Sequence, residues 1–234
     1  MKAIDEEKGV LRWGGLAGIL GGIIFILVFV VVIAFVGPEP AGPEGEIMRF
    51  PDIRVGRTVE DGLYLTVLIL WVAHFLALYR ALREANLAPA LFGSVLGIVG
   101  LGVLAAGALP HVATAPISAL YHAPGATPED QAALVLVWQA TEGIFDALFG
   151  VGLLLVPVGF VALGVAMLGT PIFGKRFGGV SVALGVVGVV AASVLLVDPL
   201  SPSAFVGVLA LIVFHLVVGW KLYGLSRAPR EFRT

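Results

Sequence analysis

The sequence predicts an all-α polytopic membrane protein, a bundle of six transmembrane helices, and three observations lead to this prediction. The chain of 234 residues is 59% hydrophobic and only 13% charged, and its mean hydropathy is +1.04. Soluble domains carry about 25% charged residues, so this chain has too few charges to cover a water-facing surface. The charges also leave six uncharged stretches, each able to hold the about 20 apolar residues that cross a bilayer.

These totals also argue against several classes of protein. A soluble enzyme, a disordered protein and a nucleic-acid-binding protein all need more charge than this chain carries. The chain contains no cysteine, which excludes disulfides and thiolate metal sites. We therefore expect the protein to lie in a lipid bilayer and to bind no nucleic acid.

The uncharged stretches predict the helices in order, within a single transmembrane domain that covers 1–234. The first apolar run is longer than the 7–15 residues of a signal-peptide core, so we expect it to remain as the first helix. Residues 37–61, rich in Pro, Gly and acid, are expected to form an extracytoplasmic loop. Four prolines indicate a second loop after the third helix. The expected spans are 14–36, 62–82, 89–109, 146–169, 177–197 and 204–224.

The fourth helix is expected to begin well before its span. Thr127 suits an N-cap, Pro128 suits the first helical position, and Glu129 and Asp130 favour the positive end of the helix dipole. The helical pattern then continues to about residue 169, which is about 63 Å at 1.5 Å per residue. Because a bilayer needs half that length, we expect 128–145 to be an extracytoplasmic or interfacial extension, with candidate bends at Gly143 and Pro157.

The basic residues predict the orientation. Eleven of the 14 lysines and arginines lie in the two tails and in the second and fourth connections. The other three lie in 37–61. The positive-inside rule then places both termini in the cytoplasm, and we expect the cytoplasmic membrane of a prokaryote. In the basic cytoplasmic tail, 225–234, we expect Arg227, Arg230 and Arg233 to bind anionic lipid headgroups.

Glycines at four-residue spacing predict close helix packing. Gly14, Gly18 and Gly22 line one face of the first helix, and Gly93 and Gly97 line one face of the third. Such small residues let helix backbones approach closely. The contact is either within the chain or with a second copy or another subunit of a membrane complex.

The order of these elements resembles a known pattern. A helix, an outer loop and two helices precede the long stretch PEDQAALVLVWQATEGIFDALFGVGLLLVPVGF, and FGKRFGGVSVALGVVG leads into the fifth helix. The chain resembles an uncharacterised bacterial six-helix membrane family, a domain of unknown function. The resemblance implies the six-helix fold, and it supplies neither an activity nor a catalytic residue.

Two histidines are expected inside the membrane, where ionisable residues are costly and therefore suggest function. His74 and His215 both lie about 17 Å from the outer ends of their helices, at 1.5 Å per residue. They would either hydrogen-bond neighbouring helices, or hold a b-type haem iron or one transition-metal ion, or relay a proton. The sequence leaves these alternatives open.

A second polar group is expected near the outer face. Glu142 and Asp146 are four residues apart and share one side of a helix. His111 follows the third span, His122 lies in the next loop, and Asp198 ends the fifth helix. Imidazole and carboxylate groups suit a divalent metal ion or a site where a carboxylate activates water. Alternatively, the carboxylates face water and Asp198 caps a helix.

The leading functional hypothesis is a membrane protein that binds a small ligand or cation in an outward-facing polar pocket. His111, His122, Glu142, Asp146 and Asp198 would line it. One alternative is a haem- or metal-dependent membrane redox protein or enzyme that uses His74 and His215. The other is an accessory subunit of a membrane complex. Nucleotide-binding and serine-hydrolase motifs are missing from the sequence.

Overall fold

The structure, a computed structural model, describes residues 2–38, 40–199 and 201–227, and the side chains from residue 7 onward. In this part the chain forms six α-helices and one short π-helix. Their bounds are α1 Lys2–Val31, η1 Val32–Val36, α2 Pro43–Leu82, α3 Leu87–Tyr121, α4 Pro128–Leu168, α5 Gly174–Val197 and α6 Ser203–Arg227. Each expected span lies within one of these helices, with η1 continuing the first and the fourth reaching one residue past α4.

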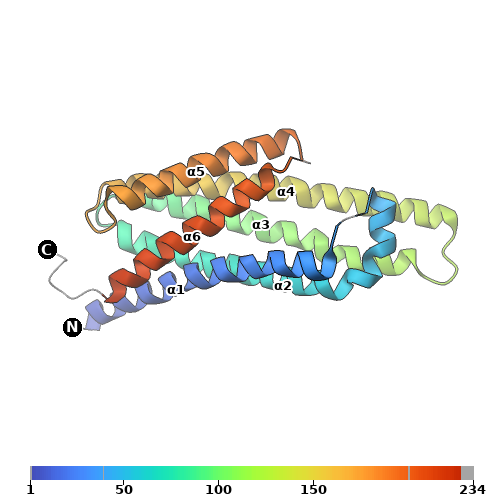
Figure 1. Ribbon diagram of the computed structural model, residues 1–234, viewed down its shortest axis with the longest axis horizontal. Helices are drawn as coiled ribbons and strands as arrows, with labels where there is room; N and C mark the ends of the chain where they lie inside the picture. Colours follow the sequence, from blue (N-terminus) through green and yellow to red (C-terminus); the bar gives the residue numbers. More distant parts are fainter. Residues whose placement is uncertain (1, 39, 200, 228–234) are drawn as a thin grey trace.

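The six helices form one elongated bundle (Figure 1). All six that the structure describes are long and apolar enough to cross a membrane, so the predicted all-α fold with six helices of membrane-spanning length is confirmed. Helix α1 packs between α2 and α6, α3 between α2 and α4, and α5 between α4 and α6. Each helix therefore contacts the next one along the chain, and contact between α1 and α6 closes the ring.

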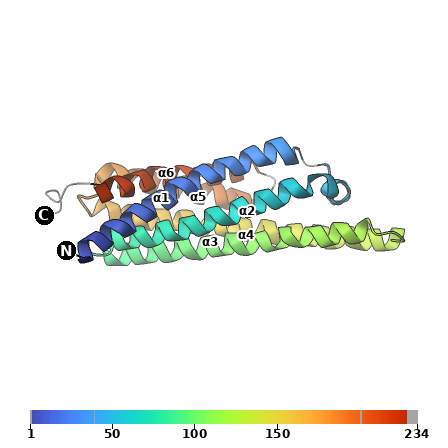
Figure 2. The same cartoon turned by 90° about the horizontal axis from the view of Figure 1, so that it is seen from below.

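Helices α3 and α4 reach further along the bundle than the other helices (Figure 2). They run side by side and project beyond α1, α5 and α6 at the end opposite to the start of α1 (Figure 2). We call this the distal end; it holds the connection from α3 to α4 and the first turns of α2. Helix α4 alone has 41 residues, or about 62 Å at 1.5 Å per residue, so the α3–α4 pair determines the length of the molecule.

Helix α4 begins where the sequence predicts. The Thr127 side chain accepts a hydrogen bond from the backbone N–H of Asp130 at 3.2 Å, and the Asp130 carboxylate accepts one from the Thr127 N–H at 3.1 Å. This reciprocal capping box satisfies two donors that a helix start leaves unpaired. Gly143 and Pro157 lie within one continuous helix.

The expectation of a loop over 37–61 is wrong from residue 43 onward, because α2 already begins at Pro43. Proline at the first position and Glu44 and Glu46 in the first turn favour a helix start. Ile47 and Phe50 are buried there, which gives the segment an apolar face to pack. The first turns run across the bundle at a steep angle to the rest of α2 (Figure 1), and Pro51 inside the helix accounts for the bend.

The expectation of a loop after residue 109 is also wrong, because α3 continues to Tyr121 through Pro110 and Pro116. A proline inside a helix removes one hydrogen bond and crowds the preceding turn. Here α4 runs beside α3, and Ile117 and Tyr121 are buried. This packing outweighs the loss, since tertiary contacts provide most helical stability in proteins.

The buried side chains form two separate hydrophobic cores. The larger core fills the bundle between all six helices. A small second core at the distal end, the distal core, consists of Ile47, Phe50, Ile117, Tyr121 and Trp138. On α2, α3 and α4, the residues between the two cores include several charged side chains.

The glycine ladders pack against other helices of the same chain. A methyl group added to Gly93 would lie 2.8 Å from the carbonyl oxygen of Gly159, so α3 and α4 touch backbone to backbone. The corresponding neighbours are Ala77 for Gly14, His74 for Gly18, Leu216 for Gly22 and Phe75 for Gly97. These close approaches are what small residues permit in transmembrane bundles, and we propose no contact with a second chain through them.

Candidate ligand-binding site

The charged side chains between the two cores meet around His111. Its Nδ1 lies 3.6 Å from Asp61 Oδ1 on α2, and its Nε2 lies 3.6 Å from Glu142 Oε2 on α4. The Phe145 ring stacks on the imidazole, with ring centroids 4.0 Å apart. The imidazole is thus held between two carboxylates and one aromatic face, and both contacts are ion pairs when it is protonated.

Arginines on α2 are bound to oxygen atoms of the same chain. Arg57 donates to Glu60 Oε2 at 3.0 Å. Arg49 donates to the carbonyl oxygens of Val36 and Pro38. Arg49 thereby joins the first turns of α2 to the end of η1, which fixes the segment that covers the charged residues.

The charged layer consists of Arg57, Asp61, His111, Glu142 and Asp146. A cavity of about 320 Å³, the distal pocket, opens over it. Helices α2, α3 and α4 supply most of its wall. The lining residues are Pro40, Glu46, Arg49, Phe50, Ile53, Arg57, Asp61, His111, Thr114, Trp138, Glu142, Asp146 and Pro199. Trp138 Nε1 donates to Glu46 Oε2 at 3.1 Å, and its ring meets Phe50 edge-on at 5.5 Å, so the pocket is partly aromatic.

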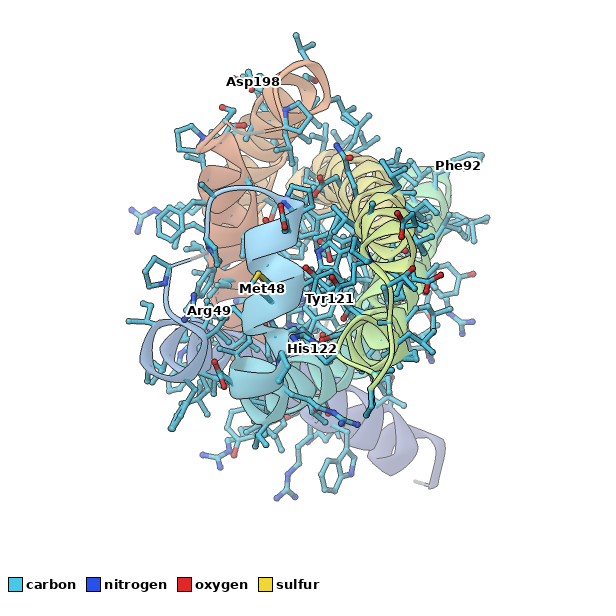
Figure 3. The ribbon with its side chains drawn as sticks, turned by 90° about the vertical axis from the view of Figure 1, so that its right-hand side faces the viewer. Met48, Arg49, Phe92, Tyr121, His122 and Asp198 are labelled. Atoms are coloured by element: carbon cyan, nitrogen blue, oxygen red, sulfur yellow. The ribbon has the colours of Figure 1, made fainter. Side chains whose placement is uncertain are left out.

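Three of the five predicted site residues meet at this pocket, namely His111, Glu142 and Asp146. The other two, His122 and Asp198, do not line it. His122 Nδ1 donates to the carbonyl oxygen of Ser118 at 2.8 Å, at the end of its own helix. Asp198 is the C-cap of α5, and it lies well apart from His122 and Arg49 when the distal end is viewed directly (Figure 3).

Several lining residues were missed by the sequence analysis, above all Asp61, Arg57 and Glu46. All three lie in the segment that we expected to be a loop. The signal was present, because Arg57 and Asp61 have the same four-residue spacing as Glu142 and Asp146, which on a helix places two side chains on one face. The spacing of Arg57 and Asp61 places their side chains on one face only if 43–61 is helical.

The arrangement does not fit the divalent metal ion that the sequence suggested. Among the described residues, no three His, Asp or Glu side chains gather in a way that would hold a metal ion. Each ring nitrogen of His111 faces a carboxylate, so neither is directed at a shared centre.

The two intramembrane histidines do come together, in the core between α1, α2 and α6. Their ring centroids lie 5.0 Å apart. His74 Nδ1 donates to the carbonyl oxygen of Gly14 at 2.9 Å, and Trp71 stacks on His215 with centroids 4.0 Å apart. Within the described part of the chain, His74 Nε2, Trp71 Nε1 and both nitrogens of His215 have no hydrogen-bond partner.

The geometry of this pair does not fit a haem. Two axial histidines approach a haem iron from opposite faces, with the macrocycle between their rings. Here the rings contact each other at an interplanar angle of 64°, and Phe75, Phe160 and Phe214 also pack edge-on against His215. Both histidines are fully buried. The pair is therefore a packed aromatic cluster that contains unpaired nitrogens.

Comparison of the chain with known protein families, curated proteins and solved structures gave no match. The resemblance to a bacterial six-helix family therefore rests on the order of the helices alone. What the fold and the site define is a class: a multi-pass helical membrane protein with a charged layer and a partly aromatic pocket at one end of its bundle.

Proposed function

We propose that this protein binds a small organic cation in the distal pocket. The observation that carries the proposal is the charge of the pocket wall. Four carboxylates line the pocket, those of Glu46, Asp61, Glu142 and Asp146, against two guanidinium groups and the His111 imidazole, which lies between Asp61 and Glu142. Arg57 is paired with the carboxylate of Glu60. Even with His111 protonated, the carboxylates outnumber the cationic groups of the wall, so the wall favours a positively charged ligand.

The aromatic part of the wall favours an organic cation over a metal ion. Phe50 and Trp138 stand in the same pocket as the carboxylates, and ring faces attract ammonium and guanidinium groups. A bare metal ion would gain little from such rings and would require several oxygen or nitrogen ligands at short range. The volume of about 320 Å³ is at the small end of the about 300–1,000 Å³ typical of ligand pockets.

We further propose that the distal end faces away from the cytoplasm, in the cytoplasmic membrane of a prokaryote. The support is the excess of lysine and arginine at the opposite end of the helices. Helix α4 would then extend out of the bilayer over 128–145. Arg227, stacked on the Tyr223 ring at 4.4 Å, would stand near anionic headgroups on the cytoplasmic side; Arg230 and Arg233 lie outside the described residues.

The proposal is tested by titrating the full-length purified protein with tetramethylammonium and with guanidinium, each against sodium at equal ionic strength. Isothermal titration calorimetry should show saturable binding of at least one organic cation. The variant Glu142→Gln keeps the shape of the side chain and removes its charge. Because the attraction between two unit charges about 4 Å apart near a protein surface is up to about 4 kcal/mol, the variant should weaken the binding of either cation about tenfold or more.

Glu129→Gln is the matched control. Glu129 lies in the first turn of the same helix, is exposed, and does not line the pocket. Its loss should leave the affinity unchanged. If neither cation binds, or if both variants weaken binding equally, the distal pocket is not a cation site.

A further inference from the structure

A second cavity adjoins the distal pocket through the charged layer. This inner cavity has a volume of about 350 Å³. The two cavities share one wall, which consists of Arg57, Asp61, His111, Glu142 and Asp146. The same charged side chains therefore face two spaces of different character.

The inner cavity lies deeper in the bundle than the distal pocket. On α2 the distal pocket is lined within 46–61 and the inner cavity within 57–64; on α4 the ranges are 138–146 and 142–149. Both shifts lead away from the distal end. A ligand long enough to occupy both spaces would thus lie along the bundle axis.

Beyond the shared wall, the inner cavity is mainly apolar. Its lining comes from α1, η1, α4 and α6 as well as α2 and α3. The principal apolar residues are Phe25, Phe29, Val32, Phe145, Phe149 and Val208. Glu60, which also lines this cavity, is paired with Arg57 at 3.0 Å, and the apolar remainder of the wall suits a hydrocarbon chain.

Tyr64 supplies an independent sign that this cavity receives a ligand. Its side chain lines the inner cavity, and its hydroxyl is buried without a hydrogen-bond partner among the described residues. Buried hydroxyls are nearly always hydrogen-bonded, since leaving one unpaired is costly. On α2 it lies one turn below Asp61, next to the charged wall.

We propose that the ligand is a single-chain amphiphilic cation, with its ammonium head in the distal pocket and its apolar tail in the inner cavity. This inference rests on the proposed function and names the class of the ligand. The charged wall neutralises the head, Tyr64 donates a hydrogen bond to a polar atom near it, and the aromatic side chains of α1 and α4 enclose the tail.

The test is a series of alkyltrimethylammonium ions, from tetramethyl to hexyltrimethyl, titrated into the full-length protein. Burial of each methylene should raise the affinity about fourfold until the cavity is filled. Alkylsulfonates of equal chain length control for uptake by detergent, because they carry the same tail and the opposite charge. They should not bind saturably.

A cavity-filling variant locates the tail. Val32→Phe places a ring in the inner cavity and should abolish the gain with chain length while preserving tetramethylammonium binding. Val30→Phe is the matched control, because Val30 is 52% exposed and does not line the cavity. If Val32→Phe does not fold, the chain-length series on the unaltered protein still decides the question.

Two results would overturn the inference in different ways. If tetramethylammonium binds and longer chains bind no better, or if the sulfonates bind equally well, the tail has no site and the proposed cation site alone remains. If no ammonium ion binds at all, the proposed function fails together with the inference.

Discussion

At the scale of single residues, His74 and His215 have different chemical surroundings although they contact each other. His74 donates to a backbone carbonyl on α1. His215 is stacked on Trp71 and has no hydrogen-bond partner among the described residues. A phenylalanine ring would therefore replace the His215 ring without loss of a hydrogen bond, but it would not replace the hydrogen bond that His74 makes.

We therefore expect opposite effects from the same substitution at these positions. His74→Phe should lower the free energy of unfolding by about 1–3 kcal/mol, because it leaves a carbonyl unpaired and removes a hydrogen bond. His215→Phe should leave stability unchanged or raise it, since it removes two buried unpaired nitrogens. Unfolding of the purified protein by graded denaturing detergent measures both. A large loss in His215→Phe would show that His215 has a partner.

At the scale of helices, the α3–α4 pair depends on backbone contact at its glycines. A methyl group added to Gly159 would lie 2.6 Å from the Gly93 carbonyl oxygen, whereas one added to Gly143 on the same helix meets nothing within 4 Å. The two glycines should therefore respond differently to replacement by alanine. Gly159 is required by packing, and Gly143 only weakens the helix.

Gly159→Ala should destabilise the protein by about 1–3 kcal/mol through overpacking. Gly143→Ala should stabilise it by up to about 1 kcal/mol through helix propensity. The transition midpoints of the two variants and the parent protein, measured side by side, test this pair. Equal shifts in the same direction would contradict the close approach of α3 and α4.

The starts of α4 and α2 differ in how well the sequence predicts them. Thr127 and Pro128 predicted the start of α4 correctly, because the N-cap of a helix depends on only a few neighbouring residues. The starting pattern at Pro43 is similar, but Gly and Pro around it suggested a loop, and only burial against α3 and α4 makes it helical. Because that segment was expected to be a loop, Asp61 and Arg57 were missed as site residues, whereas the four-residue spacing of Glu142 and Asp146 was enough to predict them.

At the scale of the whole molecule, the proposed orientation can be tested directly because the chain contains no cysteine. Single cysteines in place of Glu129, at the distal end, and Glu84, at the opposite end, create one target each. Both positions are exposed. A membrane-impermeant maleimide applied to intact cells should label Glu129→Cys, and Glu84→Cys only after the cells are opened. The reverse pattern would invert the topology.

The two cores described above have a further consequence. The distal core has five buried side chains and is separated from the membrane bundle by a charged layer, so its contacts do not continue into the larger core. Regions with few buried contacts open locally at a lower free energy than the whole fold. Amide hydrogens of the first turns of α2 should therefore exchange with solvent long before those of the bundle. The protein would then lose the proposed ligand site while its membrane fold stays intact.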